Sequence, residues 1–480
     1  MRTSPRPSAR PPRPSVAQPA PEGSDARSVA FETLVAIEER PVFVRVVLDD
    51  LCQALGVSPR DRALALEIAA GVTRRRATLD AVLAPHIRTP EGRIEPRLRT
   101  VLRMGAYQLL FLAVPPHAAV FEMVELARRR QPRWTRFVNG VLRSVQRDLT
   151  ETSAPVPGAH GVPVCDLSNR AGEVHLAYRQ FRSPLFPAPE SDFRGYVAAA
   201  FSLPTWLVDR WSTRYSPEQL LQLAAWFATP GRMSLRINSL RTSTAEVLQR
   251  LNEHGVAALA GAHEGAIQLL ESARVESLPG FTDGQFSVQD ESAIAATALL
   301  DPQPGQRVLD LCAAPGGKSA ALAERMQNRG QIIAADSDAA RVALIAPGAA
   351  RLGLTIIEPV VVRLDGSDIP AGPFDRILLD APCSNTGVLG KRPEARWRIS
   401  ESGIAELASI QASLLRSAMD RLAPGGRLVY STCSVEPTEN EDVVRRILAE
   451  WPEIQLLSER THHPGQPGDG GYQALMAQGR

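Results

Sequence analysis

The most informative segment of the chain is Asp310-Leu311-Cys312-Ala313-Ala314-Pro315-Gly316-Gly317-Lys318-Ser319. The apolar run 307–311 is typical of a buried strand, and the run 319–326 is rich in helix formers. A strand, a glycine-rich bend and a helix present backbone N–H groups to a ligand at a strand's carboxyl end. Asp336 ends the next apolar run about twenty residues after Gly316, the spacing of an acid that binds ribose hydroxyls. These features predict an adenosine-type cofactor.

Two better-known glycine patterns do not fit this segment. Gly317-Lys318-Ser319 looks like the end of a phosphate-binding P-loop, but Cys312 stands where that motif has its first glycine. The spacing of the dinucleotide-binding pattern G-x-G-x-x-G is also missing. A glycine-rich turn without a ligand remains the alternative for this segment alone, and the strands that follow it argue against that alternative.

Composition narrows the class of protein. A chain of 480 residues with 44% hydrophobic content is long enough for two to four globular domains. No apolar run approaches the roughly twenty residues of a membrane span, and no signal peptide opens the chain, so we expect a cytoplasmic protein without a membrane partner. Five scattered cysteines argue against a disulfide framework, and no Cys/His cluster has the spacing of a metal site.

Composition and periodicity divide the chain into five segments. Pro, Arg, Ser and Ala dominate the start, helical spacing follows with Ser58-Pro59 as a helix start, and short strands are predicted at 234–238 and 266–270. We expect a disordered tail at 1–26, an all-α RNA-binding domain at 27–150, an interdomain linker at 151–195, a small α+β RNA-binding insert at 196–285 and a catalytic domain at 286–480.

Arginines gather in the helical domain. Arg74-Arg75-Arg76 and Arg128-Arg129-Arg130 form two triplets, and Trp134 lies among further arginines. A solvated helical surface would explain one such triplet. Several clusters in one domain, with an aromatic residue among them, favour a polyanionic partner.

The catalytic domain repeats strand-then-helix units, which predicts a mostly parallel sheet with helices on both faces. Further strands are predicted at 360–365, 375–380 and 427–434. Polar residues fall at the carboxyl ends of these strands, where ligands bind in open α/β sheets: Asp310, Asp336, Asp365, Asp380 and Cys433. A helix cap or a buried structural cysteine would explain any one of them. Their joint placement favours an active site.

Two cysteines, Cys383 and Cys433, follow neighbouring strands and suggest a specific chemistry. A thiolate that adds to carbon 6 of a cytosine makes carbon 5 nucleophilic, so that carbon 5 can attack a methyl sulfonium. An acid such as Asp380 can hold N3 of the base. The residues alone leave open which cysteine attacks, because DNA cytosine methyltransferases use the cysteine of a Pro-Cys motif like Pro382-Cys383.

The motifs resemble those of a known family. Segments 310–319, 380–383 and 431–434 look like the motifs of RNA cytosine-5 methyltransferases of the NOL/NOP/Sun superfamily. Segments 102–110, 114–120 and 137–143 resemble the NusB-like domain of the bacterial ribosomal RNA small-subunit methyltransferase B family. The likeness covers most of 27–472. Gly390 stands where a further basic residue would be expected, the linker is long, and the Pro-rich tail is extra.

The resemblance implies an α/β fold, with a Rossmann-like methyltransferase domain preceded by an all-α NusB-like domain and a small α+β insert. It implies methylation of a cytosine of 16S rRNA at carbon 5 by a monomer, before full subunit assembly. Cys433 would be the nucleophile, Cys383 would aid product release, and Asp380 would contact N3. The implied ligands of S-adenosyl-L-methionine are Cys312, Ala313, Ala314, Pro315, Gly316, Gly317, Lys318, Asp336, Asp365 and Asp380; no metal is implied.

Two other classes of protein are less consistent with these residues. A binding protein with an inert C-terminal domain would not need an intact Cys433, Asp380 and glycine loop. An amino-group methyltransferase would carry an Asn/Asp-Pro-Pro-aromatic run where Asp380-Ala381-Pro382-Cys383 stands.

Overall fold

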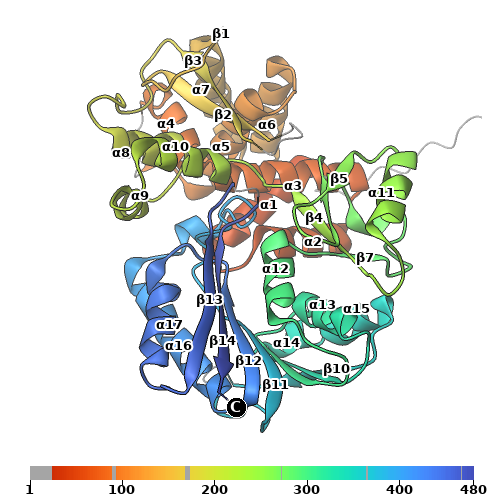
Figure 1. Cartoon of the computed structure of the whole chain (residues 1–480). Coiled ribbons are helices and arrows are strands. Elements are labelled where there is room, and N and C mark those ends of the chain that lie inside the picture. Colours follow the sequence, from red (N-terminus) through yellow and green to blue (C-terminus); the bar gives the residue numbers. More distant parts are fainter. Residues whose placement is uncertain are drawn as a thin grey trace, which may run out of the picture.

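The computed structural model describes residues 24–88, 93–167, 173–271, 273–363, 366–465 and 468–479. Figure 1 shows a helical part at one end of the molecule and a large sheet at the other, with a smaller part containing short strands beside them. The C-terminus lies at the end of the large sheet that faces away from the helical part. The predicted tail falls outside the described residues except for its last three.

Helices fill the region that the three-four spacing of apolar residues predicts as helical. They are α1 (Ala26–Glu39), α2 (Val44–Leu55), α3 (Pro59–Arg74), α4 (Arg76–Leu83), α5 (Pro96–Phe111), α6 (Pro116–Arg130) and α7 (Thr135–Asp148). The predicted helix start is confirmed, since the Ser58 side chain accepts the backbone N–H of Asp61 at 3.1 Å and Pro59 opens α3.

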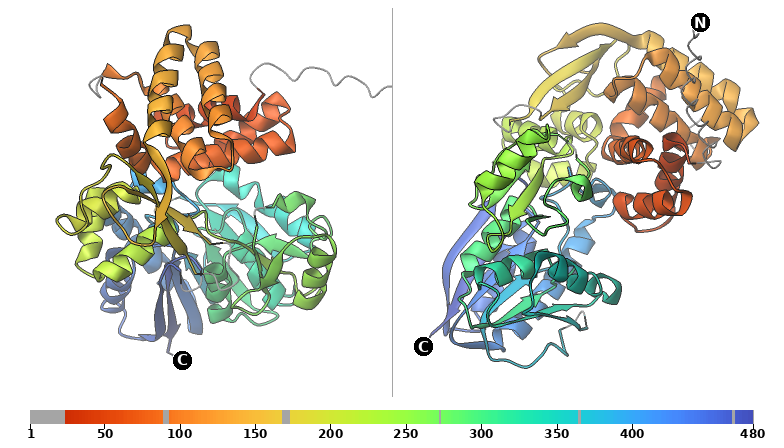
Figure 2. Two further views of the ribbon diagram at one scale, coloured as in Figure 1. Left: turned by 90° about the horizontal axis from the view of Figure 1, so that it is seen from above. Right: turned by 90° about the vertical axis from the view of Figure 1, so that its right-hand side faces the viewer.

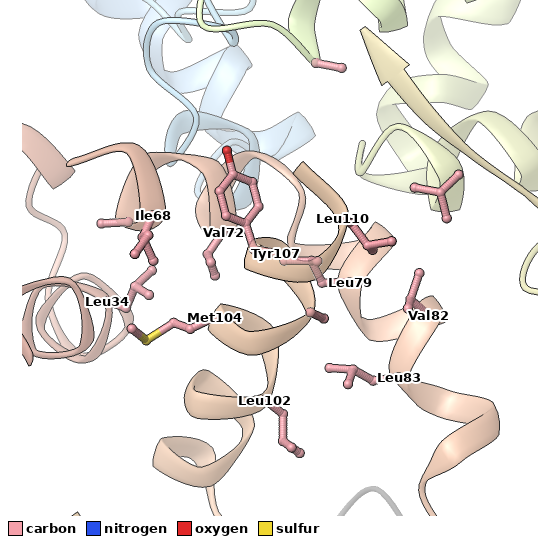
Figure 3. Packing of buried hydrophobic residues seen from close by; sticks show 14 of the residues in the cluster. Leu34, Ile68, Val72, Leu79, Val82, Leu83, Leu102, Met104, Tyr107 and Leu110 are labelled. Carbon is pink, nitrogen blue, oxygen red and sulfur yellow. The ribbon is translucent and has the colours of Figure 1, made fainter. Parts of the chain in front are cut away.

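Helix α5 is the centre of this part, because 12 of its 16 residues are buried. Figure 3 shows Met104, Tyr107 and Leu110 of α5 among apolar side chains of the surrounding helices. Helix α3 crosses α5 closely at Gly71, where a Cβ atom would lie 2.0 Å from the Tyr107 ring. Only a glycine fits at that crossing without displacing the ring.

The region predicted as an irregular linker contains a sheet instead. Its strands β1 (Leu149–Ala154), β2 (Gly161–Asp166) and β3 (His175–Phe181) form an antiparallel sheet in the order β1-β3-β2. The linker interpretation of 151–195 is therefore wrong for this stretch. Strand β1 is polar and largely exposed, and β2 contains Pro163, so neither shows the apolar alternation that identifies strands from sequence. Helices α8 (Phe193–Ala200), α9 (Thr205–Ser212) and α10 (Pro217–Phe227) follow.

The α+β insert is built on a four-stranded antiparallel sheet in the order β5-β6-β4-β7. Its elements are β4 (Met233–Ile237), α11 (Thr244–Glu253), β5 (Ala258–Ala260), β6 (Ala266–Leu269) and β7 (Phe286–Val288). Ser243 and Glu246 form a capping box at the start of α11. Strand β7 pairs with β4, so Phe286–Val288 completes this sheet rather than opening the last domain.

The large sheet has seven strands in the order β10-β9-β8-β11-β12-β14-β13. The first five strands run parallel, and β14 and β13 are antiparallel to their neighbours. The strands are β8 (Arg307–Leu311), β9 (Gln331–Asp336), β10 (Ile357–Val361), β11 (Phe374–Asp380), β12 (Leu422–Thr432), β13 (Ile454–His462) and β14 (Gly471–Gln478).

Helices cover both faces of this sheet, as predicted for repeated strand-helix units. Buried side chains of α16 (Glu401–Met419) and α17 (Glu441–Leu448) pack on one face. Those of α12 (Glu291–Leu300), α13 (Gly317–Arg325) and α15 (Ile345–Leu352) pack on the other, and α14 (Ala339–Val342) is a short turn of helix. Figure 1 shows these two helical layers on opposite sides of the strands.

Two strand predictions need correction. Strand β10 ends at Val361, so the predicted strand 360–365 is displaced, and Asp365 lies outside the described residues. The antiparallel pair β13 and β14 is not predicted from the sequence at all. Most residues of β13 are exposed, so they show no apolar alternation.

The loop between β11 and α16 joins the large sheet to the helical part. Arg396, in this loop, is fully buried and donates hydrogen bonds to the carbonyls of Arg74, Phe201, Ser202, Phe227 and Leu389 at 2.8–3.4 Å. These carbonyls come from α3, from the helices α8 to α10 and from the loop itself. Figure 2 shows the helical part seated on the rest of the molecule in both further views. The loop that follows Cys383 is thus fixed by other segments of the chain.

Candidate active site

The predicted site residues converge at one edge of the large sheet. Strands β9, β8, β11 and β12 are parallel neighbours, so their carboxyl ends meet at the same edge. Asp336 ends β9, Asp380 ends β11, and Asp380 lies opposite Ser431 of β12. Cys383 lies three residues after the end of β11, and Cys433 directly follows β12.

The two cysteines are in contact. Their sulfur atoms lie 3.1 Å apart, and both side chains are half-buried. A hydrogen bond from Cys383 lowers the pKa of Cys433 against the opposing effect of burial, with Arg392 and Lys318 contributing in the same direction. The same hydrogen bond, together with burial, raises the pKa of Cys383 well above that of an ordinary thiol. The pair is therefore polarised, with Cys433 as the better thiolate and Cys383 as the hydrogen-bond donor.

Asn385 contacts both cysteines. Its side-chain oxygen lies 3.3 Å from the sulfur of Cys433 and also accepts a hydrogen bond from Arg392, while its amide donates to the carbonyl of Cys383 at 2.8 Å. Its backbone φ is +63°, a left-handed conformation that asparagine tolerates better than most residues. The neutral thiol of Cys433 can donate a hydrogen bond to this oxygen. When the thiol is deprotonated this hydrogen bond is lost, and the positive charge of Arg392 nearby stabilises the thiolate instead.

Glu439 connects the loop that contains Cys383 with the loop that contains Cys433. Its buried carboxylate accepts the backbone N–H of Ser384 at 2.8 Å and the hydroxyls of Ser384 and Ser434, each at 2.5 Å. These serines directly follow Cys383 and Cys433. Burial raises the pKa of Glu439, although the hydrogen bonds that it accepts oppose this shift. Sequence reasoning missed both Glu439 and Asn385; their only signals were the polar residues that follow Cys433 and Cys383, respectively.

Lys318 and Asp380 form an ion pair beside the thiols, with 2.6 Å between Nζ and Oδ2. Burial works against the charge of Lys318, but Asp380 raises its pKa, so the ammonium stays protonated. Lys318 belongs to the glycine-rich segment, and the pair therefore connects the candidate cofactor loop with the candidate base contact. The exposed fraction of the Asp380 side chain is 31%, which leaves it open to a ligand.

The glycine-rich segment has the form that a nucleoside cofactor requires. Asp336 accepts the backbone N–H of Ala314 at 3.0 Å and that of Asp338 at 3.1 Å, so it fixes the loop from 312 to 316. Gly316 begins helix α13 with a φ of +96°, a conformation that favours glycine. Burial raises the pKa of Cys312, and this cysteine is therefore a neutral loop residue rather than a second nucleophile.

Asp310 is one strand-end acid that does not face the site. It is fully buried, accepts a hydrogen bond from the Ser319 hydroxyl at 2.6 Å, and burial raises its pKa to about 7. Its contact with α13 makes it a structural residue that joins the strand to the helix.

The two arginine triplets do not form the open basic surface that their sequence pattern indicates for a polyanionic partner. Arg74 and Arg75 are buried, and Trp134 is buried too, so none of these side chains can face a partner. The second triplet is exposed but paired: Arg128 lies 3.0 Å from Glu125, Arg129 2.9 Å from Asp25 and Arg130 2.7 Å from Glu32. Sequence spacing does not reveal such pairing, because two of these acids lie about a hundred residues away.

The described ranges contain no group of three or more His, Cys, Asp or Glu side chains that could hold a metal ion. In the same ranges, no helix combines the length and the apolar character that crossing a membrane requires.

Comparisons with known proteins agree with this fold and site. The NusB family matches residues 24–147, the ferredoxin-like domain of RsmF/B-like methyltransferases matches 203–276, and the family described as 16S rRNA methyltransferase RsmB/F matches 297–476. Ribosomal RNA small subunit methyltransferase B of Klebsiella pneumoniae is 33% identical over 456 residues, covering 94% of both chains. A Bacillus subtilis protein described as a probable ribosomal RNA small subunit methyltransferase B is 34% identical over 437 residues, covering 90% of both.

Solved structures share the fold. The crystal structure of PH0851 superposes with a TM-score of 0.73 at 24% identity, covering 95% of this chain and 98% of that one. A methyltransferase homologue from Pyrococcus horikoshii gives a TM-score of 0.54 at 27% identity, covering 60% of this chain and 99% of its own.

The sheet order, the glycine-rich loop and the strand-end acids define an S-adenosyl-L-methionine-dependent methyltransferase with a NusB domain at its N-terminal side. Relatives described as ribosomal RNA small subunit methyltransferase B, or as probable members of that group, are 32–35% identical over most of the chain, which identifies the family within this class. The chain belongs to the ribosomal RNA small subunit methyltransferase B family.

Proposed function

We propose that the chain methylates carbon 5 of a cytosine in 16S rRNA through a covalent bond between Cys433 and carbon 6 of that base. The observation that carries the proposal is the contact of two thiols, 3.1 Å apart, whose pKa values are shifted in opposite directions. Methylation of an exocyclic amino group needs no thiol, because that nitrogen can attack a methyl group without prior activation of the ring. A polarised pair of thiols suits both the addition to carbon 6 and the release from it.

The residues around the thiols suit the steps of this reaction. The Cys433 thiolate forms a bond to carbon 6, and the electron pair displaced from the C5–C6 double bond makes carbon 5 nucleophilic while charge builds up at N3. N3 takes up a proton from solvent as this charge develops, so that its N–H can donate to the Asp380 carboxylate, and Lys318 beside Asp380 supplies a further positive charge. After methylation the proton on carbon 5 leaves to a base, the C5–C6 double bond re-forms, and the Cys433–C6 bond breaks. The Cys383 thiol then donates a hydrogen bond to the departing thiolate.

The donor set fits the cofactor. Asp336 and Asp380 place two carboxylates at the ends of β9 and β11, on either side of β8, and Asp336 keeps free lone pairs for ribose hydroxyls besides the two backbone N–H groups that it accepts. We assign the loop 312–318 and these two acids to S-adenosyl-L-methionine, while Asp365 stays a prediction. When bound, the cofactor supplies the electrophilic methyl group. The carboxylates also balance the positive charge of its sulfonium.

Nucleoside analysis of methylated RNA tests the proposed function. The full chain would be incubated with unmodified 16S rRNA and cofactor carrying a tritiated methyl group, and the digested RNA separated by chromatography with mass detection. We expect the label in 5-methylcytidine, at one position that bisulfite sequencing then locates. Label in N4-methylcytidine, or no label in naked or partly assembled rRNA, would refute carbon-5 methylation.

Replacing Asp336 with alanine is expected to weaken cofactor binding about 10- to 100-fold. The change removes hydrogen bonds to a charged group, which contribute about 1.5–3 kcal/mol, and it frees the N–H of Ala314 in the loop. Calorimetric titration with S-adenosyl-L-methionine measures the change. Asp420→Ala, an exposed acid at the end of α16, is the matched control and should bind the cofactor like the unchanged chain. Equal affinity of Asp336→Ala and the control would remove Asp336 from the cofactor site.

A further inference from the structure

Phe43 of the helical part lies next to the candidate active site. It directly precedes α2, and its side chain is 44% exposed although it is large and apolar. The guanidinium carbons of Arg392 and Arg398, from the loop after Cys383, lie 5.6 Å and 5.9 Å from the centre of its ring. Arg392 in turn donates to Asn385, the residue in contact with Cys433. Two side chains thus separate an exposed aromatic ring from the candidate nucleophile.

The turn that carries Phe43 is held firmly against the methyltransferase domain. The backbone N–H of Val44 donates to the carboxylate of Glu394 at 3.3 Å, and Arg398 donates to the carbonyl of Val42. The ring therefore has a fixed position relative to the two thiols. Both arginines lie over the ring near the roughly 6 Å limit of a cation–π contact, and the 44% exposure of Phe43 leaves part of its surface available.

A cavity lined by several arginines lies close to this ring. Its volume is about 680 Å³, it lies between the helical part and the loop 394–398, and Arg398 lines it as well as flanking Phe43. Arg76 faces this cavity with its guanidinium carbon 5.3 Å from the centre of the Trp397 ring. The other lining arginines are Arg40, Arg97 and Arg103. Glu38, Glu39 and Glu394 also line it. Arg103 is paired with Glu38 at 2.8 Å and with Asp80 at 2.7 Å, and Arg97 lies 3.7 Å from Glu39, so Arg40, Arg76 and Arg398 are the arginines that offer positive charge to a ligand.

We propose that Phe43, flanked by Arg392 and Arg398, stacks an unpaired base next to the target cytosine, and that the RNA strand runs on into this cavity. The inference rests on the proposed function, because it names how the same site takes its substrate. Single-stranded RNA is recognised by aromatic rings that stack on bases, with arginines on the backbone, and this combination surrounds Phe43. The helical part then contributes a residue to substrate recognition within reach of the catalytic thiols.

Ring substitutions test the stacking. Phe43→Ala should weaken binding of a short RNA containing the target cytosine about 10- to 100-fold, the range of base–aromatic stacking, and raise the KM for RNA with little change in cofactor affinity. Phe43→Trp should restore binding, since it keeps an aromatic face. Phe121→Ala, a phenylalanine of α6 that is 60% exposed, is the matched control and should bind like the unchanged chain. Fluorescence anisotropy with labelled RNA measures all four proteins.

Abasic RNAs identify the stacked position. Each nucleotide near the target would be replaced in turn by an abasic one, and binding measured with the unchanged chain and with Phe43→Ala. At one neighbouring position the abasic nucleotide should lower the RNA affinity of the unchanged chain about tenfold, and it should not lower the affinity of Phe43→Ala any further. Two results would overturn the inference while the unchanged chain still methylates RNA. One is that the losses of affinity from the abasic nucleotide and from Phe43→Ala multiply independently at every position; the other is that Phe43→Trp binds RNA as weakly as Phe43→Ala. Failure of the unchanged chain to methylate RNA would instead refute the proposed function.

Discussion

Cys433→Ala is expected to lose methyl transfer by several orders of magnitude while binding S-adenosyl-L-methionine as the unchanged chain does. The reason is that carbon 5 of cytosine is not nucleophilic until a thiolate has added to carbon 6, and losing a catalytic nucleophile in other enzymes has effects of this size. Release of label from the tritiated cofactor into RNA measures the rate, and calorimetry measures cofactor binding. Cys165→Ala, a half-buried cysteine of β2, is the matched control and should retain its activity.

The pH dependence of the unchanged chain gives an independent check on this nucleophile. Cys383, Arg392 and Lys318 lower the pKa of Cys433. We therefore expect the rate to decrease as the pH is lowered, with a midpoint at a lower pH than the pKa of an ordinary thiol. Turnover of Cys433→Ala near that of the Cys165→Ala control would show that Cys433 is not the nucleophile. The covalent route would then have to begin at Cys383.

The convergence of the site could be predicted from the sequence because it depends on parallel strands. Short apolar runs bounded by glycine or proline identify β8, β9, β11 and β12, and in a parallel sheet their polar end residues must meet at one edge. Asp336, Asp380, Cys383 and Cys433 are therefore placed correctly by a local pattern alone. The distance between the two sulfur atoms and the direction of their pKa shifts required coordinates.

Other parts of the site depend on contacts between distant segments, which no local pattern encodes. Glu439 acts through serines in two loops, one of them 55 residues away, so its role exists only after both loops have folded. Arg74 is a second case in which contacts with a distant segment decide the role of a residue. Its place in an arginine triplet indicates a solvated surface, yet it is buried and donates to the carbonyl of Gly390, 316 residues away.

Cys383→Ala should form the covalent protein–RNA adduct and clear it slowly, so that a species stable in denaturing gels accumulates. The hydrogen bond from Cys383 stabilises the Cys433 thiolate, and that thiolate is the leaving group when the adduct breaks down. Without this donor the pKa of Cys433 rises, so adduct formation should also need a higher pH than in the unchanged chain. Gel analysis with labelled RNA and cofactor, over a range of pH, measures both effects.

Three further variants separate the roles of the two thiols. Cys383→Ser keeps a hydrogen-bond donor and should clear the adduct faster than Cys383→Ala; equal trapping by both would mean that Cys383 assists release as a base rather than as a donor. Cys433→Ala and the double variant should form no adduct, since nothing attacks carbon 6. Trapping by Cys433→Ala, with none by Cys383→Ala, would reverse the assignment and make Cys383 the nucleophile. Because an adduct needs an attacking sulfur, whichever single variant still traps RNA retains the thiol that attacks.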